Sequence, residues 1–396
     1  MAASYRPATR GSRLRYAAVA LAATVAATAG TAPATAATAT VSASPQAATP
    51  GFDDQVRAIA YRGDTIYLGG EFTTATSGGK RVSRGYVAAV NAATGALTRW
   101  APAVNGPVTA LAVRGDAIYL GGSFTTVGGA AHRHLAKVDA TTGAVDGSFR
   151  HSVSTAPYAL TVSSGRLYAG GSFRTADGAA RAGVAAYDLG GNALDPHFHP
   201  SVDGTVRGIA VSGGRAYLGG TFHTVDGAGG HDRLAAVDAT TGALDTGFAG
   251  DAPYAVHHVT VAGDTVYAAL GGPGGRLVAY RPGGKPAWTL TTDGDLSGVV
   301  VLDGVVYGGG HFDHACTTAR VATSNGDCLD GNERRQKLLA TDPSGHLLGW
   351  APQANSTIGV TALAASASRH ALAAGGTFTS FANSATRSRF AQFTRG

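Results

Sequence analysis

A short phrase returns about every fifty residues, and it constrains the fold of this chain more than any other feature. The phrase has the form Tyr-x-Gly-Gly-x-Phe, and regular copies begin at Tyr67, Tyr119, Tyr168 and Tyr217. Degraded copies begin at Tyr267, Tyr307 and Ala373. A fixed period of this length indicates an array of similar supersecondary units. Because a repeat determines architecture more than chemistry, functional residues must be sought where the copies differ.

Each unit contains four runs that are typical of β-strands. In the second unit they cover residues 108–113, 117–125, 135–139 and 144–149. β-Branched and aromatic residues recur in these runs with a period of two, and Gly and Asp bound them, which indicates strands and hairpins. No long apolar stripe with a 3.6-residue period follows residue 50, so we expect no helices there.

Two repeated turns support this interpretation. Gly115 and its equivalents separate the first two runs, where a two-residue hairpin loop needs the positive φ that Gly adopts easily. The sequence Asp-x-x-Thr-Gly separates the third and fourth runs at Asp139 and again at Asp238. An Asp side chain in such a turn can bond the turn backbone, so we expect these Asp and Gly residues to have structural roles.

Seven units of about fifty residues fit within residues 54–396. We therefore predict an all-β domain, a seven-bladed β-propeller with four-stranded blades. The last unit ends with a third run at Phe390–Phe393, so its fourth strand is missing. A strand from residues 37–53, a segment rich in Ala, Thr, Ser and Pro, is predicted to complete this blade and close the ring. Closure would remove two exposed sheet edges.

With this phrase, this turn and this period, the chain resembles the delta-60 repeat β-propeller family of secreted actinobacterial proteins over nearly all of residues 54–396. The resemblance implies a propeller fold and secretion, and it brings no established catalytic residues. The Asp238–Leu244 turn also resembles that of pyrroloquinoline-quinone propellers, which would imply a quinoprotein-like dehydrogenase. The chain lacks their adjacent-cysteine pair and has only three Trp residues, so we rank that function below the others.

Residues 1–36 have the pattern of a secretory signal peptide. Four Arg residues precede an apolar run at 16–29, and Ala34-Thr35-Ala36 provides a cleavage site. We expect the mature chain to begin near residue 37, to be extracellular and to have no transmembrane segment, since the apolar run is short. The four Arg residues contribute four of the six net positive charges, which leaves +2 and gives little support for nucleic-acid binding.

Cys316 and Cys328 are the only two cysteines, and they flank an insertion in the sixth unit that runs to about residue 337. In an exported protein two nearby Cys residues predict a disulfide. The alternative is a zinc site built from both cysteines with His311 and His314, because His and Cys are zinc ligands.

The first strand of each propeller blade lines the central channel, so differences among these strands indicate a candidate ligand site. The third position is Ala or Gly in six units, whereas the fifth unit has His258. The second position is mostly polar: Arg57, Thr109, Tyr158, Arg207, His257, Ser297 and Thr361. We predict that an anionic or sugar-like ligand contacts Arg57, Tyr158, Arg207, His257 and His258.

A second group of exceptional residues surrounds the fifth and sixth units. The fifth unit has almost lost the loop after the phrase, at residues 271–275, beside the long loop of the sixth unit. A notch is expected there, with His257, His258, His311, Asp313 and His314 converging on it. Imidazoles suit zinc or copper, so the candidate cofactor is a divalent metal bound by His258, His311 and His314. The competing interpretation is that these His residues only solvate the surface.

Two functional hypotheses follow. The first is a secreted, monomeric binding or interaction module for an extracellular protein or carbohydrate, with its ligand on the loop-bearing face of the channel. The second is a secreted metal-dependent hydrolase or lyase that uses the His cluster between blades 5 and 6. No Ser-His-Asp order, phosphate-binding Gly loop or paired Glu motif stands out, so the sequence identifies neither a reaction nor a ligand.

Overall fold

The computed structural model describes residues 39–382 and 385–395; the expected signal peptide lies outside them. The described chain is all-β, as predicted. It contains no α-helix, and its one helical turn is the 3-10 turn η1 (Ala367–Arg369). No helix within these residues is long and apolar enough to cross a membrane.

Seven hairpins of one kind recur along the chain, each with a seven-residue strand followed by a six-residue strand that carries the phrase. They are β2 (Val56–Arg62) and β3 (Thr65–Gly70), β7 (Val108–Arg114) and β8 (Ala117–Gly122), β12 (Pro157–Ser163) and β13 (Arg166–Gly171), β18 (Val206–Ser212) and β19 (Arg215–Gly220), β21 (Val256–Ala262) and β22 (Thr265–Leu270), β25 (Leu296–Leu302) and β26 (Val305–Gly310), and β30 (Val360–Ser366) and β31 (Ala371–Gly376). All seven pairs are antiparallel.

A third antiparallel strand follows in each sheet. These strands are β6 (Val87–Asn91), β11 (Leu135–Asp139), β16 (Val184–Asp188), β20 (Leu234–Asp238), β23 (Gly275–Tyr280), β29 (Leu338–Thr341) and β32 (Phe390–Thr394). A fourth strand is present as β17 (Ala193–Leu194) and β24 (Pro286–Thr292). In the first, second, fourth and sixth sheets the fourth run makes a single bridge to the third strand, as Val90 does with Leu97.

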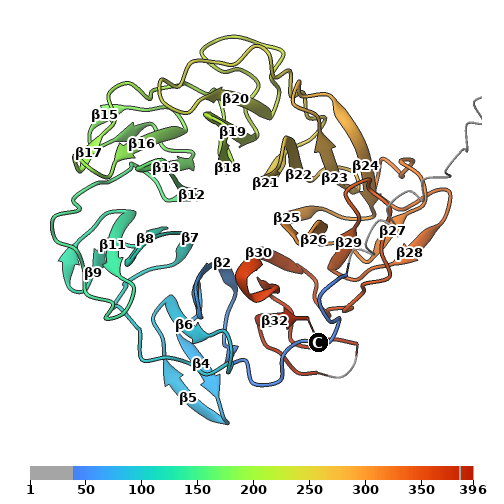
Figure 1. Ribbon diagram of the computed structural model, residues 1–396, viewed down its shortest axis with the longest axis horizontal. Coiled ribbons are helices and arrows are strands. Elements are labelled where there is room, and N and C mark those ends of the chain that lie inside the picture. The colour runs from blue at the N-terminus through green and yellow to red at the C-terminus, as the bar shows by residue number, and fades with distance from the viewer. Residues whose placement is uncertain (1–38, 383–384, 396) are drawn as a thin grey trace, which may run out of the picture. The chain divides into compact units, whose positions relative to one another are not determined.

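The first strands contact one another in chain order, and β30 contacts β2. Figure 1 shows these strands facing a common centre, with the later strands of each sheet farther out. Clusters of buried side chains lie between neighbouring sheets. One cluster joins Tyr67 and Val87 of the first sheet to Ile118 and Leu120 of the second. Burial of apolar surface between successive sheets therefore stabilises the array.

The repeated phrase is explained by contacts between neighbouring sheets. A Cβ atom on Gly69 would lie 2.6 Å from Cγ1 of Val108, in the first strand of the next sheet. The hydroxyl of Tyr67 donates a hydrogen bond to the Ala140 carbonyl, also of the next sheet, at 2.7 Å. The phrase thus combines a close approach that requires Gly with a hydrogen bond from its Tyr.

The predicted third-to-fourth turn is also found. The Asp139 carboxylate accepts hydrogen bonds from the backbone N–H groups of Thr141 and Thr142, at 3.0 and 2.7 Å. Gly143 closes the turn at a φ of 75°. These contacts confirm the structural role expected for this Asp and this Gly.

The chain contains a second repeated device that sequence analysis missed. An Asp, Asn or Ser a few residues before the first strand accepts hydrogen bonds from two successive backbone N–H groups in the loop after the phrase. In the fourth unit, Asp203 Oδ1 accepts from His223 at 2.7 Å and from Thr224 at 3.0 Å. The other residues of this kind are Asp53, Asn105, Ser154, Asp293 and Asn355. Each joins two loops on the same face.

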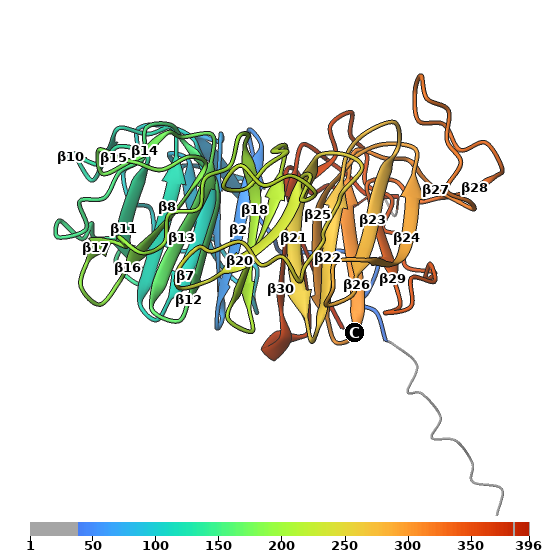
Figure 2. The ribbon, with the colours of Figure 1, turned by 90° about the horizontal axis from the view of Figure 1, so that it is seen from above.

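Short strands extend these loops. β1 (Gly51–Phe52), β4 (Thr74–Ser77) and β5 (Lys80–Ser83) form one small sheet. Two small hairpins are β9 (Thr126–Val127) with β10 (Ala130–Ala131), and β14 (Thr175–Ala176) with β15 (Ala179–Ala180). Figure 2 shows these hairpins on the side opposite η1.

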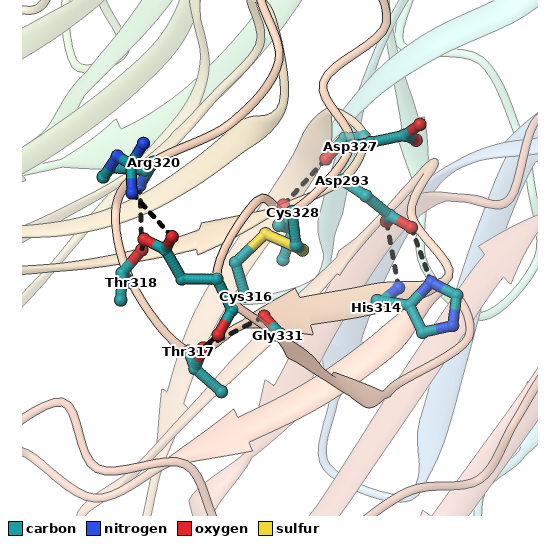
Figure 3. Close-up of a disulfide and its surroundings, with 12 residues drawn as sticks. Asp293, His314, Cys316, Thr317, Thr318, Arg320, Asp327, Cys328 and Gly331 are labelled. Carbon is teal, nitrogen blue, oxygen red and sulfur yellow. Dashed lines mark hydrogen bonds and ion pairs between the residues drawn. A yellow bond between two sulfur atoms is a disulfide. The ribbon is translucent and has the colours of Figure 1, made fainter.

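The insertion of the sixth unit joins the fifth sheet. Its strands β27 (His314–Cys316) and β28 (Asn332–Arg334) extend that sheet to six strands, through pairing of Thr292 with Ala315. Cys316 and Cys328 form a disulfide across the insertion, which confirms the predicted bond (Figure 3).

The segment before residue 47 lies beside the last sheet. The backbone N–H groups of Ser42 and Gln46 donate to the carbonyls of Thr394 and Gln392 in β32, at 2.9 and 2.7 Å. The N–H of Val41 donates to the Tyr307 hydroxyl at 3.0 Å. Phe52, within the segment predicted to close the ring, pairs with Ala75 of β4, and its N–H donates to the Ser388 carbonyl, just before β32, at 3.0 Å.

Candidate functional site

All seven first strands carry a β-bulge at their second residue. The pairing register skips from Val56 to Ala58 in β2, and the same skip occurs in the other six strands. A bulge leaves one residue unpaired and redirects its side chain. The skipped residues are the polar second-position residues Arg57, Thr109, Tyr158, Arg207, His257, Ser297 and Thr361.

These residues line one cavity at the centre of the array, with a volume of about 170 Å³. The five predicted ligand-binding residues all lie on its wall: Arg57, Tyr158, Arg207, His257 and His258. At about 30 Å³ per water molecule, the cavity has room for about six waters. It therefore suits one small polar molecule or one group of a larger ligand.

Three of the skipped side chains connect adjacent first strands. Thr109 Oγ1 donates to the Pro157 carbonyl at 2.7 Å, and Thr361 Oγ1 donates to that of Val56 at 3.1 Å. His257 Nδ1 lies 3.0 Å from the Leu296 carbonyl. Since a carbonyl only accepts, Nδ1 carries the proton, and Nε2 of the neutral ring remains a hydrogen-bond acceptor.

The two arginines of the cavity differ in their surroundings. The Arg57 guanidinium forms a salt bridge with Glu71 at 2.8 Å. Arg207 makes no ion pair or hydrogen bond within the described residues, and its guanidinium lies over the Tyr158 ring, 5.6 Å from the centroid. The fourth unit has Thr221 where the first has Glu71. The charge of Arg207 is therefore not compensated by a carboxylate.

The two histidines are held as neutral groups. Burial lowers the pKa of His257; the Asp295 carboxylate opposes this shift, and Arg207 adds to it. Burial also lowers the pKa of His258, and the nearby backbone of Val299 opposes that shift in part. His258 Nδ1 is shielded from solvent and has no hydrogen-bond partner among the described residues.

A second cavity, of about 450 Å³, lies where the notch was expected. Its wall includes Pro273 of the shortened loop, His311, Asp313, and residues 323–325 of the disulfide-bonded insertion. Asp293, Asp295 and Lys337 also line it, and sequence analysis did not single them out. Their position in the sequence, next to the exceptional loops, could have indicated them. The pairing of Lys337 with Asp313, at 2.9 Å, could be found only in the structure.

The expected convergence of five residues on the notch does not occur. His257 and His258 line the central cavity, whereas His311 and Asp313 line the notch. His314 is turned toward Asp293, with Nδ1 at 2.7 Å from Oδ2 (Figure 3). Asp293 also accepts the backbone N–H of His314, so this pair belongs to the repeated loop contact described above.

The structure does not bring His258, His311 and His314 together as metal ligands. Within residues 39–382 and 385–395, no three His, Cys, Asp or Glu side chains are grouped as a metal site. The zinc site with both cysteines is also not formed, because Cys316 and Cys328 are joined in a disulfide. His258 lines the central cavity, His311 lines the notch, and His314 is held by Asp293, so the three imidazoles are separated.

Comparison with known proteins shows similarity in fold. No family model matches the chain, and no curated protein matches it. The structure of U3-55K has a TM-score of 0.58 and 12% identity, covering 89% of this chain and 100% of that one. The WD40 β-propeller domain of Doa1 has a TM-score of 0.52 and 11% identity, covering 89% and 97%. The computationally designed protein Ika8 has a TM-score of 0.51 and 13% identity, covering 89% and 100%. At these identities the likeness shows a β-propeller-like fold alone.

Proposed function

We propose that this chain is a secreted seven-bladed β-propeller that works as a binding module, with its ligand at the mouth of the central channel. Propeller folds of this kind serve many functions, so the proposal rests on the site and not on the fold. The single observation that carries it is that the five residues predicted from the sequence, four at the polar second position and His258 at the third, line one cavity.

The blade count and the closure of the ring belong to the same proposal. Seven equivalent hairpins and the contact between β30 and β2 support seven blades around one axis. The bonds from Ser42 and Gln46 to β32 support closure by residues 41–46 as a fourth strand. Such closure would cover an open sheet edge.

Secretion is supported by the sequence pattern of residues 1–36 and by the disulfide, since disulfides persist in oxidising compartments. We expect the exported protein to begin near residue 37 and to be a monomer. N-terminal sequencing of protein recovered from culture medium tests the cleavage. Recovery only from cells, with residues 1–36 intact, would contradict secretion.

Binding at the channel can be tested by a crystallographic screen with small sugars, carboxylates and short peptides. We expect bound ligands to contact Arg207 and Tyr158 at the channel mouth. Ligands found only in the notch beside His311, or only on the outer loops, would refute the proposed site.

A further inference from the structure

Arg57 and Arg207 form a matched pair within the chain. Both are the bulge residue of a first strand, and both line the central cavity. They differ because Glu71 neutralises Arg57, whereas Thr221 stands at the equivalent position in the fourth unit. Arg207 is therefore the cavity arginine whose donors are free for a ligand.

A free guanidinium in a narrow site favours a carboxylate. Its planar set of donors matches the two oxygens of a carboxylate, and the two can form parallel charge-assisted hydrogen bonds. At pH 7 the two arginines carry the only formal charges among the residues that line this cavity. With one of them neutralised by Glu71, the wall has an excess charge that matches a single anionic group.

The two imidazoles of the cavity favour a second group on the ligand, one that can form hydrogen bonds with neutral rings. His257 has an unused Nε2 acceptor, because its Nδ1 bonds the Leu296 carbonyl. His258 also lines the cavity, and because its Nδ1 atom is shielded from solvent, a ligand would meet this ring at Nε2. A ligand hydroxyl both donates and accepts, so it can satisfy either tautomer of these rings. A simple carboxylate has no hydroxyl to offer them.

We infer that the channel binds a sugar acid, with its carboxylate on Arg207 and its hydroxyls on the imidazoles of His257 and His258. This inference rests on the proposed binding function and names the chemical class of the ligand. The cavity volume of about 170 Å³ suits one such unit, and Tyr158, with 47% of its surface exposed, lies where a longer ligand would leave the site.

Three probes separate the groups of this ligand: glucuronate has the carboxylate and the hydroxyls, glucose has the hydroxyls alone, and acetate has the carboxylate alone. Affinities of the full folded protein can be measured by ligand-observed NMR titration. We expect glucuronate to bind about tenfold more tightly than either of the others. Glucose lacks the charge-assisted bond of the carboxylate, and acetate lacks the neutral hydrogen bonds of the hydroxyls.

Variants of the two cavity arginines test which of them binds the carboxylate. Arg207→Gln should reduce the affinity for glucuronate about tenfold or more, toward that for glucose. The charge-neutral double variant Arg57→Gln/Glu71→Gln should lose less affinity than Arg207→Gln, because the charge that it removes is already paired with Glu71. Glu71→Thr should raise the affinity, because it frees a second guanidinium. Melting curves check that each variant is folded.

Three outcomes would overturn the inference while leaving the binding function in place. One is equal affinity for glucose and glucuronate, and another is equal loss in the Arg207→Gln and Arg57→Gln/Glu71→Gln variants. Failure of all three probes, while the crystallographic screen finds other ligands in the channel, would also overturn it. A screen that finds no channel ligand would instead refute the binding function itself.

Discussion

His258 stands where the other six units have Ala or Gly, and this difference has a physical consequence for stability. In the folded protein burial holds its pKa below the usual value for histidine. The unfolded chain therefore binds a proton first as the pH falls below about 6.5. Above that pH the ring is neutral in both states and does not lower the stability of the fold. As the pH falls toward the folded pKa, protonation of the unfolded chain lowers the free energy of unfolding.

We predict that His258→Ala reduces the loss of stability between pH 7.5 and pH 5.5. The fold should be retained, because Ala occupies the same position in four other units, at Ala58, Ala110, Ala159 and Ala362. The measurement is the melting temperature of parent and variant at both pH values. An unchanged pH dependence in the variant would show that His258 is not a source of the acid sensitivity. If the imidazole also contacts ligand, the variant should bind glucuronate more weakly.

Among the strands and loops, the contact between two loops of one unit is a repeated feature that the sequence did not reveal. Asp203 receives two backbone hydrogen bonds, from His223 and Thr224, and the bond from Thr224 is the main cause of the lowered pKa of Asp203. Asn serves the same role at Asn105 and Asn355. The contact therefore depends on an acceptor oxygen and not on charge.

We predict that Asp203→Ala lowers the free energy of unfolding by about 1–2 kcal/mol, since two backbone donors lose their acceptor. Asp203→Asn is the matched control and should retain most of the stability near pH 7. Chemical denaturation of the three proteins distinguishes these results. Equal losses for Ala and Asn would contradict the role of the acceptor oxygen.

The disulfide-bonded insertion is a second feature among the strands and loops. The bond closes a loop with a sequence separation of 12 residues, and such a loop is worth about 3 kcal/mol in the chain-entropy account. We predict that Cys316→Ser/Cys328→Ser exposes the insertion to proteolysis, while the seven hairpins remain folded. Thiol titration of the unreduced parent should find no free thiol. Two reactive thiols, or an insertion equally resistant in the variant, would contradict this.

The sequence could reveal the features that recur at a regular spacing along the chain. The Tyr-x-Gly-Gly-x-Phe copies gave the strand order, and the polar second positions, from Arg57 to Thr361, identified the wall of one cavity. The loop acceptors vary among Asp, Asn and Ser, so residue identity alone concealed their shared role. His311 and His314 were predicted to converge with His258 because they belong to adjacent units beside the shortened loop of the fifth unit. Their actual directions depend on loop contacts, such as that between His314 and Asp293, which no period encodes.

At the scale of the whole molecule, the seam between the first and last sheets decides whether the array is closed. Residues 41–46 reach β32 through two backbone bonds, and the indole of Trp350 donates to the Ser42 carbonyl at 3.2 Å. Val41 is buried in the apolar cluster of the last two sheets. The segment thus combines hydrogen bonds with apolar burial.

We predict that a chain beginning at residue 48 melts at a clearly lower temperature or aggregates, because the edge of β32 becomes exposed. A chain beginning at residue 39 retains the segment and is the control. Circular dichroism melting and light scattering measure the two effects. Identical behaviour of both chains would show that the ring does not depend on residues 41–46.

If the ligand binds in the channel and not in the notch, as we propose, the histidines of the two cavities should respond differently to it. Their imidazole signals can be followed by NMR while the glucuronate probe is added, with His257 and His258 reporting on the channel and His311 on the notch. We predict saturable shifts of the His257 and His258 signals and little change at His311. Shifts confined to His311, with the channel pair unchanged, would contradict it.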